Sequence, residues 1–134
     1  MIKIAIGLVL LAHGIGHSMG ILQILNVATV NPAWRGDSWV LTSVIGAAVS
    51  QVVGVAIWVA AIVGFTALAA VVVGWLPASW WQPLAIGSSL ISLVGVLLFP
   101  IAFPTFSTIG AVLVDVAVLA AVFAFHWGPA DLPA

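Results

Sequence analysis

The chain has 134 residues, of which 65% are hydrophobic and only 4% are charged, and its formal net charge is -1. A soluble domain carries about 25% charged residues, so this composition excludes a soluble globular protein. The weak net charge gives no reason to expect a nucleic-acid partner, and without cysteine the chain has no disulfide, iron–sulfur or thiol chemistry.

The first long apolar run covers residues 4–27 and is interrupted mainly by the segment AHGIGH at residues 12–17. A membrane-spanning helix needs about 20 apolar residues, so we expect the first transmembrane helix here. A cleaved signal peptide is the alternative because Lys3 precedes the run, but no small-residue cleavage site follows it. Residues 28–37 contain Asn-Pro, glycine and the only arginine, which is typical of a surface loop.

The second apolar run, residues 40–76, contains no proline and is too long for one perpendicular span. As a straight α-helix it would measure about 55 Å, against a hydrocarbon core of about 30 Å. We therefore expect residues 50–75 to cross the membrane and residues 38–49 to form an interfacial or bent extension. Gly46, Gly54 and Gly64 are the candidate bends, and a single long tilted helix is the alternative.

Two further helices are predicted at residues 84–99 and 106–127, separated by proline-containing turns. The predicted fold class is all-α: an integral membrane four-helix bundle formed as a single transmembrane domain of residues 1–134. This predicts a multi-pass protein of the cell membrane with both termini on one side. Lys3 and Arg35 lie at opposite ends of the first helix and give a tied positive-inside count, which the terminal amine tips toward cytoplasmic termini.

The rare ionisable residues inside the predicted spans form the candidate site. His13 and His17 are four residues apart and therefore share one helix face near mid-membrane. Asp115 lies at the same depth on the fourth helix, where a charged carboxylate costs at least about 2.5–3.5 kcal/mol. We therefore expect His13, His17 and Asp115 to cluster inside the bundle. The polar side chains that could support this cluster are Gln51, Ser92 and Thr108.

Several chemistries remain open for this cluster. Two histidines one turn apart with a carboxylate could ligate a metal ion, whereas a His–Asp pair could share a proton without one. Haem binding is less well matched, because histidines on one face of one helix cannot ligate both faces of a haem. The favoured function is handling of protons, a quinone-like molecule or a small apolar ligand. Alternatively, the polar residues only fix helix register in a structural membrane partner.

Two short motifs carry a resemblance to a known family. The A-H-G-x-x-H stretch at residues 12–17 and the W-W-x-P-L turn at residues 80–84 resemble small, mostly uncharacterised bacterial four-helix integral membrane proteins, some of them DoxX-like in layout. The resemblance implies a four-helix bundle and a redox or quinone-linked partner subunit, and it assigns no catalytic residue. Gly16 and Gly20 form a G-x-x-x-G pair suited to close helix packing, and the small-residue faces favour a homo-oligomer or a partner subunit.

Overall fold

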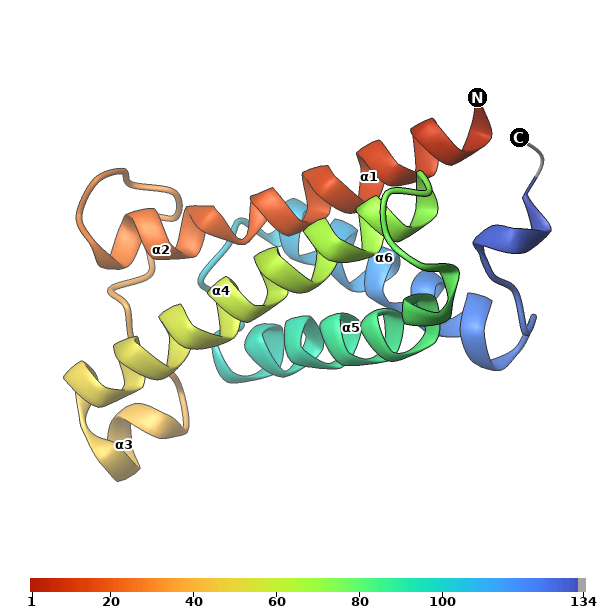
Figure 1. Cartoon of the computed structure of the whole chain (residues 1–134). Coiled ribbons are helices and arrows are strands. Elements are labelled where there is room, and N and C mark those ends of the chain that lie inside the picture. Colours follow the sequence, from red (N-terminus) through yellow and green to blue (C-terminus); the bar gives the residue numbers. More distant parts are fainter. Residues whose placement is uncertain (133–134) are drawn as a thin grey trace.

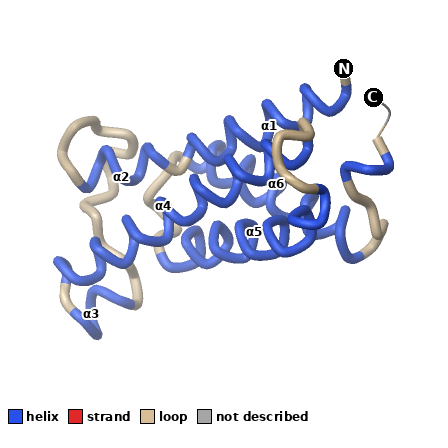
Figure 2. The backbone as a smooth tube through the Cα atoms, viewed as in Figure 1, coloured by secondary structure: helices blue, strands red, loops and turns tan. Residues whose placement is uncertain are grey.

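The computed structural model describes residues 1–132, and within them all regular structure is helical (Figure 2). Four stretches are long and apolar enough to cross a membrane: Ile2–Ile24, Ala47–Val72, Ala78–Leu98 and Thr105–Phe123. The predicted all-α fold with four spanning helices is confirmed. In chain order the elements are α1 (Ile2–Gly16), α2 (Ser18–Ile24), α3 (Leu41–Ile45), α4 (Ala47–Val72), η1 (Ala78–Trp80), α5 (Trp81–Leu98), α6 (Thr105–Phe123) and η2 (Pro129–Asp131).

The long helices run side by side and form an elongated bundle (Figure 1). Helix α4 is central, because it packs against α1 and α2 on one side and against α5 on the other. Helix α6 packs on α5 and has only a few contacts with α1. The start of α1 and the last described residues lie at the same end of the bundle. The bundle is therefore closed along three helix pairs and loose along the fourth, between α1 and α6.

The first span is interrupted by a tight turn at His17. The amide of His17 donates to Gly14 O at 3.1 Å, and the amide of Gly20 donates to His17 O at 3.3 Å, so the chain makes three-residue turns here. Helix α2 then ends at Ile24, three residues before the predicted end, where Val27 N donates back to Leu22 O at 2.8 Å. Such a bond closes a helix C-terminus.

The second apolar run bends at Gly46, as expected for one of its three candidate glycines. Gly46 has φ 83° and ψ 160°, a conformation that L-residues avoid, and it separates the short α3 from α4. Helix α4 then has 26 residues, or about 39 Å, which a tilt within the usual range fits to the hydrocarbon core. The bend removes the length mismatch that the sequence showed.

Helices α5 and α6 differ from their predicted bounds at the ends. Helix α5 begins at Trp81 rather than residue 84, and α6 ends at Phe123 rather than residue 127. The end of α6 is fixed by Trp127 N, which donates to Ala121 O at 2.8 Å, while His126 adopts a positive φ of 49°. Trp81 Nε1 donates to Trp127 O at 2.8 Å and holds this segment against α5.

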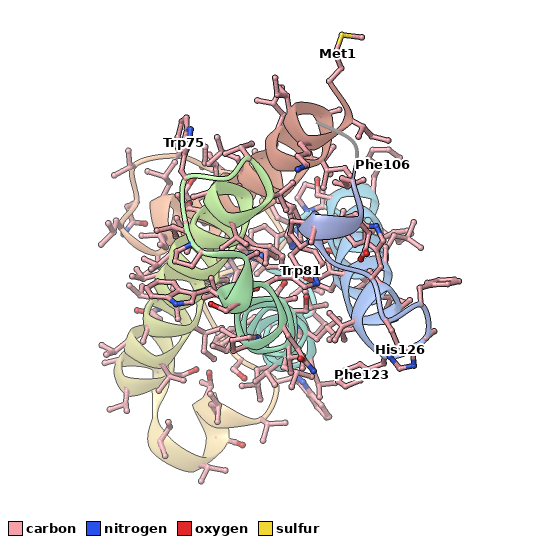
Figure 3. The ribbon with its side chains drawn as sticks, turned by 45° about the vertical axis from the view of Figure 1, so that its right-hand side comes forward. Met1, Trp75, Trp81, Phe106, Phe123 and His126 are labelled. Carbon is pink, nitrogen blue, oxygen red and sulfur yellow. The ribbon has the colours of Figure 1, made fainter. Side chains whose placement is uncertain are left out.

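Two apolar clusters fill the bundle, one toward each end. The first surrounds Phe65, Leu68 and Trp81, and the second packs Trp34, Trp58, Phe99 and Phe103 together. Other large apolar side chains point outward, as a bilayer requires: Trp75, Phe106 and Phe123 lie on the outside, whereas Trp81 points between the helices (Figure 3). The two histidines of the predicted site lie between these clusters, because Phe65 of the first packs on His13 and Phe103 of the second packs on His17.

Candidate functional site

Four side chains from three helices form one hydrogen-bonded chain. His13 Nε2 lies 3.0 Å from Asp115 Oδ1. Ser92 Oγ donates to Asp115 Oδ2 at 2.6 Å and lies 3.1 Å from His17 Nε2. Helices α1, α5 and α6 are thus connected through one carboxylate. Both histidines and Asp115 are brought together, and Ser92 provides the connection between His17 and the carboxylate.

The bounds of the spanning helices show how deep in the membrane these four hydrogen-bonded side chains lie. His13 is the central residue of the span Ile2–Ile24, and Asp115 lies one residue beyond the centre of Thr105–Phe123. The side chains of Asp115 and Ser92 are fully buried, and only 6% of the His13 side chain is exposed. A charged carboxylate at this depth costs at least about 2.5–3.5 kcal/mol, which its hydrogen bonds must offset.

The number of available hydrogens determines which atom donates in each of these hydrogen bonds. The single hydroxyl hydrogen of Ser92 goes to Asp115, so the Ser92 oxygen accepts a hydrogen from His17 Nε2. With Asp115 ionised, His13 also donates from Nε2. Donors therefore converge on Asp115 from both ends, and one further proton on His13 makes the whole group neutral.

Aromatic rings enclose both histidines. The Phe65 ring lies edge-on to His13 with centroids 4.3 Å apart and stacks beside His17 at 6.5 Å. Phe103 contacts His17 edge-on at 6.1 Å. These rings exclude water from the inner side of the chain, which strengthens its hydrogen bonds and raises the cost of leaving one unpaired.

On the outer side, the chain is reached through a pocket between α1 and α6. The pocket has a volume of about 190 Å³ and contacts both imidazoles. A cavity of about 150 Å³ accommodates benzene, so this pocket has room for a small ring. It extends from His13, at the centre of the first span, toward Ser107 and Phe103 at the start of α6, and it opens on the outer, lipid-facing side of these helices. The pocket is lined by His13, Gly16, His17, Met19, Phe103, Ser107 and Ala111.

The other sequence-predicted residues lie away from the hydrogen-bonded chain. Gln51 is in the first turns of α4, where its amide packs against Gly36 of the surface loop. Thr108 donates to backbone oxygens at the start of α6, Phe103 O at 3.4 Å and Pro104 O at 3.3 Å. Neither side chain hydrogen-bonds to the histidines or Asp115 within residues 1–132.

The close helix packing of α1 uses a different set of glycines from the predicted pair. A side chain at Gly16 would meet nothing within 4 Å, because Gly16 faces the pocket. Gly20 does pack closely, and a Cβ there would lie 2.8 Å from the Trp58 ring. The same is true of Gly7 and Gly14: Gly14 meets Phe65 of α4, and Gly7 meets Val73, the residue directly after α4. Gly7, Gly14 and Gly20 are spaced about two helical turns apart. This pattern is present in the sequence, but a search for G-x-x-x-G pairs does not find it.

Two fully buried polar atoms have no hydrogen-bond partner within the described residues: Trp58 Nε1 and Ser89 Oγ. Ser89 lies on α5 one turn before Ser92, yet only Ser92 is hydrogen-bonded to Asp115. From the sequence, Ser92 and not Ser89 is predicted as a supporting residue, and the structure shows that it is Ser92 that contacts the carboxylate. Both side chains are fully buried, so hydrogen bonding alone distinguishes them.

His13, His17 and Asp115 are not arranged around one point. Among residues 1–132, no group of three or more His, Cys, Asp or Glu side chains is placed so that it could hold a metal ion. The Nε2 atoms of His13 and His17 are directed at different partners, one at Asp115 and one at Ser92. His126, the third histidine, lies beyond the end of α6 and is not part of this hydrogen-bonded group.

Comparisons with known proteins identify no family: no family model, no curated protein and no solved structure matches the chain. The DoxX-like resemblance therefore depends on two short motifs and on the helix layout. The function has to be inferred from the geometry of the site.

Proposed function

We propose that this multi-pass membrane protein binds a lipid-soluble molecule with a small ring carrying carbonyl or hydroxyl groups, as in a quinone or its quinol. The observation that supports this is the opening of the His13–Asp115–Ser92–His17 chain into a lipid-facing pocket of about 190 Å³. Ligand sites are typically apolar clefts with a few polar groups that fix orientation. This pocket has that composition and opens on the lipid-facing side of α1 and α6, where a molecule dissolved in the bilayer reaches it.

The histidines supply the polar contacts. Their Nε2 atoms are used within the chain, whereas their Nδ1 atoms have no partner among the described residues. Both histidines line the pocket. A neutral imidazole with its hydrogen on Nε2 accepts a hydrogen bond at Nδ1, and an imidazolium donates one. The same atoms therefore suit a hydroxyl or a carbonyl.

Proton exchange with the ligand follows from the same geometry. A ligand hydroxyl that gives its proton to His13 Nδ1 creates an imidazolium directly beside the Asp115 carboxylate. The imidazolium–carboxylate pair is neutral, and the negative charge passes to the ligand oxygen, which stays beside His13 Nδ1 and accepts its hydrogen bond. Asp115 acts as a positioning residue in this proposal, because it orients the imidazole without touching the ligand.

The test is binding of menadione to the purified protein in lipid nanodiscs, with methylnaphthalene as the matched probe that lacks both oxygens. Menadione should bind saturably and shift the ¹⁵N signals of the His13 and His17 rings, and methylnaphthalene should do neither. The chain has no cysteine, so the quinone cannot react with a thiol. Equal binding of both probes, or unchanged imidazole signals at saturation, would overturn the proposal in favour of a purely structural cluster.

A pocket-filling variant locates the site. Ala111→Phe places a ring in the pocket without altering any of the four hydrogen-bonded residues, and it should abolish menadione binding. Ala117→Phe, on the same helix but outside this pocket, is the control and should bind menadione as the wild type does. Retained binding by Ala111→Phe would place the quinone elsewhere and contradict the proposal.

A further inference from the structure

The loose contact between α1 and α6 opens a second cleft on the other side of the His13–Asp115 bond. This groove has a volume of about 340 Å³ and is lined by α1, α6 and two tryptophans, with almost no polar surface. The residues that line it are Ala5, Ile6, Val9, Leu10, Trp81, Val114, Ala117, Val118, Ala121 and Trp127.

The groove and the histidine pocket follow the same helix faces. On α6, Ala111 lines the pocket, whereas Val114, Val118 and Ala121 line the groove, with spacings of three and four residues. Asp115 lies in this stripe but is fully buried, so its bond with His13 lies beneath the lipid-facing surface. The two cavities are thus consecutive parts of one seam, which extends about 15 Å along α6 from the pocket to its far end.

The chemistry of the groove restricts what can occupy it. Aliphatic side chains offer no hydrogen bond to a polar group, so the occupant is a hydrocarbon chain. The groove ends at Trp81 and Trp127, whose rings pack edge-on at 5.3 Å and are held by the bond from Trp81 Nε1 to Trp127 O. This fixed pair closes the seam at the membrane edge, and the histidine pocket lies at the other end of the groove.

We infer that the ligand is an amphiphile with one long hydrocarbon chain, whose ring lies in the histidine pocket and whose chain lies in the α1–α6 groove. This inference rests on the proposed function, because the ring position is taken from it. On binding, the hydrocarbon chain of the ligand moves from lipid to protein rather than from water to protein, so the hydrophobic effect contributes little to its affinity. The groove instead contributes van der Waals contacts and fixes the direction from which the ring enters.

Phylloquinone tests whether the groove holds a hydrocarbon chain, because it has the menadione ring with a phytyl substituent. With affinities expressed per mole of lipid, wild-type protein should bind phylloquinone more tightly than menadione. Ala117→Phe should weaken phylloquinone about tenfold and leave menadione unchanged. Ala117 is exposed to lipid, so the larger side chain has room and the variant should fold.

The outcomes separate this inference from the proposed function. If menadione binds but Ala117→Phe has no effect on phylloquinone, the ring site stands and the groove assignment is wrong. If Ala117→Phe removes a tightly bound phospholipid in native mass spectrometry while phylloquinone binding is unchanged, the groove holds an ordinary lipid chain and the inference fails. If neither quinone binds the wild type, both proposals fail together.

Discussion

Ser89 and Ser92 provide a matched pair of substitutions that tests the hydrogen-bonded chain directly. Both side chains are fully buried on α5, one turn apart. Ser92 is bonded to Asp115 and His17, whereas Ser89 Oγ has no partner within the described residues. Mutation of either serine to alanine removes the same atom from a similar environment. The difference in unfolding free energy therefore measures the bonds of Ser92.

The magnitude follows from the two bonds that are lost. Ser92→Ala leaves one oxygen of Asp115 and the Nε2 of His17 without their partner. An unpaired buried polar group costs about 1–3 kcal/mol, and side-chain hydrogen bonds inside membrane proteins are worth about 0.6 kcal/mol on average and about 1.7 at most. We expect a loss of about 1–3 kcal/mol for Ser92→Ala. Ser89→Ala removes an unsatisfied hydroxyl and should change stability by less than about 0.5 kcal/mol.

Reversible unfolding in mixed micelles, followed by far-UV circular dichroism, measures both free energies under identical conditions. A double substitution of Ser92→Ala with Asp115→Asn completes the cycle, because the serine should matter less once the carboxylate has been removed. Equal effects of Ser89→Ala and Ser92→Ala would show that the hydrogen bonds of Ser92 do not stabilise the fold. The premise of a connected chain would then be wrong.

Three further predictions concern the fold. Gly14→Ala places a Cβ 2.9 Å from Phe65 and should destabilise the bundle by about 1–3 kcal/mol, whereas Gly16→Ala meets no atom and should be neutral or slightly stabilising in the same unfolding assay. Gly46→Ala forces a side chain into φ 83° and should cost about 1–3 kcal/mol; an unchanged midpoint would show that the bend is not strained. Single cysteines introduced as Ile2→Cys and Leu132→Cys should be labelled from the same side of native membranes, and labelling from opposite sides would contradict the four-span topology.

Residue counting along the apolar runs was sufficient to place the polar residues in depth. A constant rise per residue puts His13 and Asp115 near mid-membrane, and the structure places their side chains 3.0 Å apart. The composition likewise predicted four spans, and the excess length of residues 40–76 predicted a bend. These inferences depend only on helix geometry and bilayer thickness, which vary little between proteins.

Lateral arrangement could not be predicted in the same way. Helical rise says nothing about which helices are neighbours, so the loose α1–α6 seam and its two cavities were not foreseen. Helix ends were also misplaced, because they are set by backbone bonds such as Trp127 N to Ala121 O rather than by hydropathy. The choice of Gly46 over Gly54 is a packing effect. A side chain at Gly54 would meet the Phe99 ring at 3.0 Å, so that glycine serves helix contact instead of bending.

The position of Asp115 on the last spanning helix has a consequence for biosynthesis. Because synthesis proceeds from the amino terminus, α6 is the last of these four spans to reach the membrane, and it brings the only carboxylate among them. Its partners on α1 and α5 are already inserted by then, so the cost of burying Asp115 is met by residues that arrived earlier. We therefore expect α6 to insert poorly when expressed alone and efficiently behind the first three spans. His13 and Ser92 would then act in assembly before any ligand is present.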